Sequence, residues 1–234
     1  MNPILGQLFT FLGLVTGLAV FFIESRRRKL WTSGIQQVAA WGLVTGAVAA
    51  RVTELFLAHA PLWRILDLAD GGKAIFGGVV GGWIGTEIAK WRLGLRRSTG
   101  DLFALALPAG EAVGRIGCHF NGCCYGRVTS PGFAVFQHGA WRYPTQLISS
   151  VAATFIFGVL WSLRDRFEEG KLFKLYLVLF SVSRFLIEFW RESPPAWRGL
   201  SLMQWVCIEV IVGVVIWELV ALQRKRRGVT DVAA

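Results

Sequence analysis

Long apolar runs recur along this chain of 234 residues, and they limit its possible folds more than any other feature. These runs are near the length, about 20 residues, that crosses the hydrocarbon core of a bilayer. A soluble globule would instead show amphipathic periodicity along its helices. Residues of the apolar class make up 54% of the chain, whereas charged residues make up 17% and gather between the runs. The sequence therefore predicts an all-α integral membrane protein.

Seven of these runs are predicted to be transmembrane helices. They cover residues 4–23, 35–60, 74–89, 102–117, 146–163, 172–190 and 200–222. The first run has no basic residue before it and no small-residue cleavage site after it, so it is predicted to be an uncleaved span and not a signal peptide. We expect one polytopic membrane domain over residues 1–228, followed by a short tail over 229–234.

The basic clusters of the chain lie at residues 26–29, 90–97, 164–171 and 224–227. With seven spans, all four clusters fall on the same side of the membrane. The positive-inside rule then places the N-terminus outside and the C-terminus in the cytoplasm. Topology accounts for the formal net charge of +10, so we expect no nucleic-acid partner.

Charged residues inside predicted spans are costly in hydrocarbon, so they are expected to face the bundle interior and to mark a site. They include three pairs: Arg51 and Glu54, Glu111 and Arg115, and Arg184 and Glu188. The topology puts all three pairs in the outer halves of their spans. Residues three or four apart share a helix face, so each pair is also compatible with simple ion pairing. Together they predict a polar cavity that opens toward the outer leaflet.

The segment GRIGCHFNGCCYGR, residues 114–127, begins in the fourth span and continues into a predicted extracytoplasmic loop over 118–144. Arg115 and Arg127 bracket its middle. The forked donors of arginine match phosphate oxygens, which points to the headgroup of an anionic phospholipid as ligand. Asn121 and Gly122 predict a tight turn whose backbone donors and side-chain amide face the cavity.

Three cysteines of this segment, Cys118, Cys123 and Cys124, leave several interpretations open. Their C-x4-C-C spacing differs from the C-x2-C pairs of common zinc sites, even with His119 and His138 as possible partners, so we predict no metal. A disulfide from Cys118 to one of the others is the second possibility, because the outer face of such a membrane is oxidising. The plainest interpretation is that small thiols pack a tight turn.

Glycines in the third predicted span form an overlapping GxxxG pattern at residues 77, 78, 81, 82 and 85. This pattern favours close helix packing. The alternative is that Gly77 and Gly78 expose backbone to a lipid headgroup and so take part in substrate binding.

Several motifs together resemble the prolipoprotein diacylglyceryl transferase family. They are GRIG at 114–117, NG at 121–122, YGR at 125–127, YPTQL at 143–147, SRFLIEFWR at 183–191 and LSLMQW at 200–205. The segment FGGVVG at 76–81 is similar to the family's His-Gly-Gly segment. The order and approximate spacing of the motifs also match.

The resemblance implies a bacterial inner-membrane enzyme with seven spans and its N-terminus outside. Such enzymes transfer the diacylglyceryl group of phosphatidylglycerol to the lipobox cysteine of a prolipoprotein, forming a thioether and releasing glycerol phosphate. No cofactor is expected. The implied catalytic residues are Arg115, Asn121, Arg184 and Glu188. We expect Arg127, Gln146, Gly77, Gly78 and Glu111 to contribute to substrate binding. Glu188, with Glu111 as a reserve, would orient an arginine or take the proton of the acceptor thiol.

The chain departs from the family pattern where protons are handled. Phe76 stands where the family has a histidine, Cys118 where it has an asparagine and Cys123 where it has a glutamate. The motif at 143–149 also lacks a histidine and a glutamate, with Tyr143 and Ser149 at its ends. The sequence thus leaves open a relative that uses its cysteines as thiol nucleophiles or acts on another acceptor, or a lipid-binding or thiol-redox membrane protein without transferase activity.

Overall fold

The computed structural model describes residues 1–57, 60–61, 75–95 and 98–230. Within these residues the chain forms seven helices and one short hairpin. In chain order they are α1 (Pro3–Arg27), α2 (Ser33–Leu57), α3 (Ile75–Arg92), α4 (Gly100–Asn121), β1 (Val135–Gln137), β2 (Ala140–Arg142), α5 (Thr145–Leu163), α6 (Lys171–Glu188) and α7 (Leu202–Thr230). The helical fold is the one expected from the sequence. Most of the tail predicted at 229–234 lies outside the described residues.

Four described helices are long and apolar enough to cross a membrane by themselves. These segments are Pro3–Arg27, Ser33–Phe56, Thr145–Leu163 and Leu202–Gln223. Of the other three helices, α3 contains the glycine-rich pattern, and α4 and α6 contain the buried Asp101, Arg115 and Glu188. The architecture is that of a membrane protein in which some helices are specialised for close packing or for polar groups.

The chain divides into two compact units. Met1–Glu24 and Thr99–Ala234 form the first, and Ser25–Ser98 forms the second. In the second unit, α2 and α3 approach closely at the predicted glycines. A Cβ atom added at Gly77 would lie 2.1 Å from Thr53 Oγ1, and one at Gly81 would lie 2.1 Å from the Cβ of Ala49. These contacts agree with the packing interpretation of the glycine pattern.

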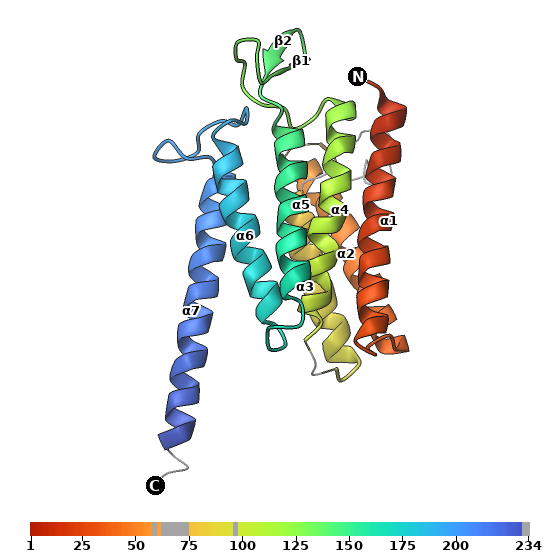
Figure 1. Cartoon of the computed structure of the whole chain (residues 1–234), viewed down its shortest axis with the longest axis vertical. Coiled ribbons are helices and arrows are strands. Elements are labelled where there is room, and N and C mark those ends of the chain that lie inside the picture. The colour runs from red at the N-terminus through yellow and green to blue at the C-terminus, as the bar shows by residue number, and fades with distance from the viewer. Residues whose placement is uncertain (58–59, 62–74, 96–97, 231–234) are drawn as a thin grey trace. The chain divides into compact units, whose positions relative to one another are not determined.

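In the first unit, α1 lies alongside α4 (Figure 1). Glycines make this approach possible on both helices: a Cβ at Gly13 would lie 2.7 Å from the carbonyl oxygen of Gly110, and one at Gly117 would lie 2.7 Å from that of Gly6. Small residues let helix backbones come this close in a bilayer. The tight contact fixes α4, which carries Arg115, against the N-terminal helix.

The core of the first unit lies between α4, α5 and α6. Its buried side chains are Ala104, Leu105, Ile156, Leu160, Leu172 and Tyr176. At one end of this core, the buried carboxylate of Asp101 accepts hydrogen bonds from the backbone N–H groups of Gly170 (2.8 Å) and Phe173 (3.1 Å). These are the otherwise unpaired donors at the start of α6, so Asp101 ties α4 to α6.

The region predicted as a loop over 118–144 contains more regular structure than the sequence suggested. Helix α4 continues to Asn121, and strands β1 and β2 pair antiparallel with Phe136 opposite Trp141. His138 (φ 51°) and Gly139 (φ 75°) form the two-residue turn between them, as expected of a type I′ hairpin turn. The hairpin lies beyond the ends of α4 and α5 (Figure 1).

Candidate active site

A pocket between α4, α5 and α6 contains two of the arginines predicted to be catalytic. Its empty volume is about 240 Å³ and is partly open to solvent. The polar side chains in its lining are Glu111, Arg115, Ser149, Ser183 and Arg184. Apolar residues of α5 and α6, including Ala153 and Phe180, line the rest. The sequence placed Arg115 and Arg184 on different spans, and the fold brings them to one cavity.

Arg115 is only 4% exposed and is held by Glu111, one helical turn earlier. Its Nε and one terminal nitrogen donate to the same carboxylate oxygen, Oε1 of Glu111, at 2.9 and 2.8 Å. A guanidinium has five N–H donors, so donors remain for a ligand. The pair fixes the orientation of Arg115 toward the pocket.

Arg184 is held in a similar way by Glu188, four residues later on α6. The Glu188 carboxylate is buried, and its Oε1 also accepts a hydrogen bond from the Ser201 hydroxyl at 3.1 Å. Ser201 in turn lies just before α7, where its N–H donates to Gln204 Oε1 at 2.9 Å. A carboxylate engaged by an arginine and a hydroxyl serves to orient the arginine.

A third arginine, Arg191, adds positive charge to this part of the molecule. It acts electrostatically on Arg184 and on Cys124, and its backbone forms a bridge with Gly126. The exposed Arg127 donates from its Nε to the carbonyl oxygen of Arg191 at 3.1 Å. The site therefore has an excess of cations over carboxylates, which suits an anionic ligand.

The end of α4 brings Cys118 and Cys123 together through a Schellman motif. Gly122 takes the left-handed conformation (φ 66°), the N–H of Cys123 donates to the Cys118 carbonyl oxygen at 3.2 Å, and the N–H of Gly122 donates to that of His119 at 3.2 Å. This motif commonly brings the residues at the positions of Cys118 and Cys123 into side-chain contact. The C-x4-C spacing is therefore the spacing of two side chains that meet.

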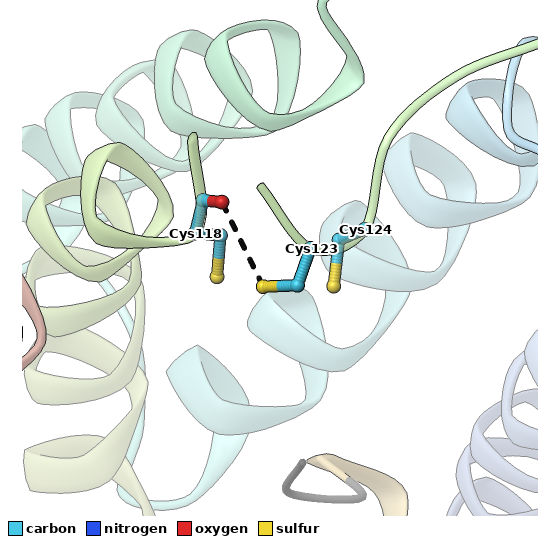
Figure 2. Close-up of side chains that lie close together, drawn as sticks. All are labelled: Cys118, Cys123 and Cys124. Atoms are coloured by element: carbon cyan, nitrogen blue, oxygen red, sulfur yellow. Dashed lines mark hydrogen bonds between the residues drawn. The ribbon is translucent and has the colours of Figure 1, made fainter. Parts of the chain in front are cut away.

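Cys124 adds a third thiol to the same place. Its φ of 60° is rare for a residue with a side chain. The three sulfurs lie within 4.8 Å of one another, and all four cysteines of the chain are free. Figure 2 shows the Cys123 side chain pointing toward Cys118, with the Cys124 sulfur on its other side. Cys118 and Cys124 are partly buried, and Cys123 is exposed.

The loop that carries these thiols is held by the start of α5. Gln146, 1% exposed, donates from Nε2 to the Cys123 carbonyl oxygen at 2.9 Å, and the Thr145 hydroxyl donates to the Cys124 carbonyl oxygen at 2.9 Å. Gln146 Oε1 is buried and has no hydrogen-bond partner among the described residues. These bonds fix the backbone of the cysteine pair.

The hairpin covers the same loop from the other side. The buried Gln137 on β1 donates to the His119 carbonyl oxygen at 3.1 Å, and the His138 ring nitrogen Nε2 lies 2.7 Å from the Gly122 carbonyl oxygen. The His138 ring also packs against that of Tyr125 at a tilt of 46°, with ring centroids 4.5 Å apart. The hairpin thus stabilises the turn. Among the described residues, the side chains that lie close enough together to hold a metal ion are cysteines alone.

Hydrogen bonds among the thiols separate their acidities. Hydrogen bonds from Cys118 and Cys123 lower the pKa of Cys124 well below the usual thiol range, and the charges of Arg191 and Arg115 act in the same direction. Hydrogen bonding to Cys118 and Cys124 raises the pKa of Cys123. Cys124 is therefore the thiol of this loop that ionises most readily, and the pKa of Cys123 is shifted in the opposite direction.

Other predicted site residues lie outside the pocket lining. Asn121 is exposed and packs against α1, where a Cβ at Gly6 would lie 1.9 Å from its Oδ1. Gly77 and Gly78 belong to the second unit, as do Arg51 and Glu54, which pair with each other at 2.8 Å. The side chain of Phe76 lies outside the described residues.

Sequence reasoning missed several contributors, among them Ser149 and Ser183 in the pocket, Arg191 beside it and Gln137 against the cysteine loop. For Arg191 a signal existed, because it belongs to the same SRFLIEFWR segment as Arg184 and follows it by seven residues. No sequence signal pointed to Gln137, since only the hairpin brings it to His119.

Comparison with known proteins supports the family expected from the motifs. The sequence model described as prolipoprotein diacylglyceryl transferase matches residues 7–220. Phosphatidylglycerol-prolipoprotein diacylglyceryl transferase 2 of Clostridium perfringens is 28% identical over 242 residues, which cover 91% of this chain and 93% of that protein. The transferase of Clostridium tetani is 26% identical and covers 94% of this chain and 98% of its own length. The transferase of Symbiobacterium thermophilum is 33% identical over 190 residues, which cover 72% of this chain and 69% of that protein.

The family match over residues 7–220 runs through α4, α5 and α6, so it includes the helices that build the pocket and the segments that hold the cysteine loop. Because the family match covers most of the sequence, the resemblance seen in the motifs is confirmed, and the chain belongs to the prolipoprotein diacylglyceryl transferase family.

Proposed function

We propose that this protein transfers the diacylglyceryl group of phosphatidylglycerol to a cysteine thiol of a prolipoprotein. The observation that carries the proposal is the pocket in which Arg115 of α4 and Arg184 of α6 meet. Relatives that cover almost the whole chain are named as transferases with this donor and acceptor. The pocket supplies what the donor requires, namely oriented cations in a partly apolar cavity.

The two arginines act on the departing phosphate. As a diester, the phosphate of phosphatidylglycerol carries one negative charge, and it gains a second as the bond from oxygen to the glyceryl carbon breaks. Interactions that strengthen as charge develops lower the barrier. Glu111 and Glu188 hold Arg115 and Arg184 in place, and the arginine donors that remain free face the phosphate oxygens.

The other predicted residues take supporting roles in this proposal. Gln146 holds the cysteine loop through its hydrogen bond to the Cys123 carbonyl oxygen, and the exposed Arg127 adds positive charge outside the pocket. Glu111 accepts both hydrogen bonds from Arg115 on Oε1, which leaves its second oxygen for the proton of the acceptor thiol. The roles of Asn121, Gly77 and Gly78 remain predictions.

We also propose that all seven helices span the bacterial inner membrane as one domain over residues 1–228, with the N-terminus outside and the C-terminus in the cytoplasm. The basic clusters at 26–29, 90–97, 164–171 and 224–227 support this orientation under the positive-inside rule. The pocket and the cysteine loop then face the outer leaflet.

The test is direct. Purified protein is incubated with phosphatidylglycerol and a lipobox peptide, and mass spectrometry measures the thioether product. The Clostridium tetani relative serves as positive control, and a peptide with serine in place of the cysteine serves as negative control. Product with the cysteine peptide alone is expected. Absence of product under conditions in which the relative is active refutes this acceptor and donor.

A further inference from the structure

Two features of the loop backbone bring the three thiols together. The Schellman motif sets Cys118 against Cys123, and a left-handed residue at Cys124 turns a third sulfur to them. Gln146 and Thr145 then hold both cysteine carbonyl oxygens. Packing alone would not require a left-handed cysteine, because glycine takes that conformation without strain. The arrangement (Figure 2) indicates that the sulfurs themselves have a use.

The separations of the sulfurs suit a thiolate-bound ion. With Zn–S bonds of about 2.3 Å in a tetrahedron, sulfurs lie about 3.8 Å apart. The sulfurs here are all within 4.8 Å of one another, so rotation of the side chains brings them to zinc-binding distance. The His138 ring nitrogen already contacts the Gly122 carbonyl oxygen, so His138 is not a ligand of the ion. Three cysteine ligands then leave one tetrahedral position open, on the exposed side of Cys123.

Two other uses of the thiols fit less well. A cysteine that attacked the glyceryl carbon would become a thioether, which is a poor leaving group and cannot pass the lipid on. A disulfide would employ two of the cysteines and leave the third without a purpose. A metal employs all three.

We propose that Cys118, Cys123 and Cys124 bind one Zn²⁺ ion whose fourth position takes the thiol of the acceptor. Catalytic zinc sites have three protein ligands and such an open position, and a thiol that coordinates zinc is deprotonated. The catalytic part of this inference rests on the proposed function. Deprotonation of the acceptor thiol by zinc would also replace the acid and base residues that the family has at the positions held here by Phe76 and Cys123.

The balance of charge and atoms is straightforward. Three thiolates and Zn²⁺ carry a net charge of −1, beside the cations of Arg115 and Arg191. Arg115 and Cys118 are three residues apart on α4 and so share a helix face. On binding zinc, the acceptor thiol gives its proton to the free carboxylate oxygen of Glu111, and the thiolate electron pair forms the bond from sulfur to the glyceryl carbon. The carbon–oxygen bond breaks, and its electron pair stays with the phosphate held by Arg115 and Arg184.

Metal binding is tested on the full chain in detergent, reduced and freed of metal, with Zn²⁺ or Co²⁺ alone as the probe. We expect one ion per chain and, for cobalt, thiolate-to-metal charge-transfer absorption. Each of Cys118→Ser, Cys123→Ser and Cys124→Ser should weaken binding by more than about 100-fold, the upper end of what changes outside the ligand shell cost. The matched control is Cys207→Ser, the remaining cysteine, which should bind zinc as the wild type does.

Three results overturn the site: no stoichiometric zinc, an equal loss in Cys207→Ser, or isolated protein whose Cys118 is in a disulfide and which binds no zinc after reduction. The fourth position is tested by adding the lipobox peptide to the cobalt form. The cysteine peptide should change the absorption, and the serine peptide should not. Equal spectra with both peptides overturn the acceptor role. Because these readouts need no phospholipid, zinc binding without any thioether product would instead refute the proposed transfer.

Discussion

Removal of the charge of Arg184 tests the site most sharply, because its effects on rate and on stability can be separated. Its side chain is 11% exposed and that of its partner Glu188 is 2% exposed. Breaking a buried ion pair by removing one partner costs about 3–5 kcal/mol of folding free energy. Arg184→Gln should therefore be clearly less stable. It should also lose about 10²- to 10³-fold in rate, as when one oriented donor to a developing anion is removed.

The double variant Arg184→Gln, Glu188→Gln separates the two effects. Without either charge, no uncompensated carboxylate remains beside Ser201, so most of the stability should return. The rate should stay low, since no cation faces the phosphate. The matched control is Lys174→Gln on the same helix, which breaks a 2.5 Å pair with Glu218. That pair is partly exposed and should contribute about 0–1 kcal/mol, with the rate unchanged.

The assays are thermal unfolding in detergent and the rate of thioether formation with phosphatidylglycerol and lipobox peptide. If the double variant regains both stability and rate, Arg184 only balances a buried carboxylate, and the reasoning about phosphate is wrong. A rate loss in Lys174→Gln as large as in the double variant would equally show that any charge change on α6 disturbs the enzyme.

The remaining predictions concern packing, capping and thiol acidity. Gly13→Ala puts a Cβ 2.7 Å from the Gly110 carbonyl oxygen and should lower the free energy of unfolding by about 1–3 kcal/mol through overpacking. The control Gly158→Ala meets nothing within 4 Å and should be neutral or stabilising. Equal unfolding temperatures for the two variants would contradict this. Asp101→Ala removes the acceptor for two backbone donors at the start of α6 and should cost about 0.5–2 kcal/mol, read from unfolding in detergent. Because the pKa of Cys124 is lowered, its thiolate persists as the pH falls below the usual thiol range. Iodoacetamide should therefore label Cys124 in reduced, metal-free protein at pH values where Cys123, whose pKa is raised, stays unlabelled, and peptide mapping that finds the reverse order refutes the assignment.

The sequence by itself determined the class of the protein and the pairing of charged side chains within single helices. Runs of apolar residues long enough to span a bilayer require helices, since backbone groups in hydrocarbon must be satisfied internally. The pairs Glu111 with Arg115 and Arg184 with Glu188 follow from helical spacing alone, and both are present in the structure. The motifs around them were sufficient to indicate the family.

Only the tertiary structure decided which of these groups act together. Spacing along one helix cannot show that Arg115 on α4 and Arg184 on α6 line the same pocket, because that depends on how α4, α5 and α6 pack. The cysteines illustrate the same limit. Their spacing alone does not predict a joint site. They meet because the left-handed Gly122 reverses the chain and Cys124 also takes a left-handed conformation. Local spacing fixes which helix face a residue occupies, whereas chain reversal and helix packing fix which residues meet it.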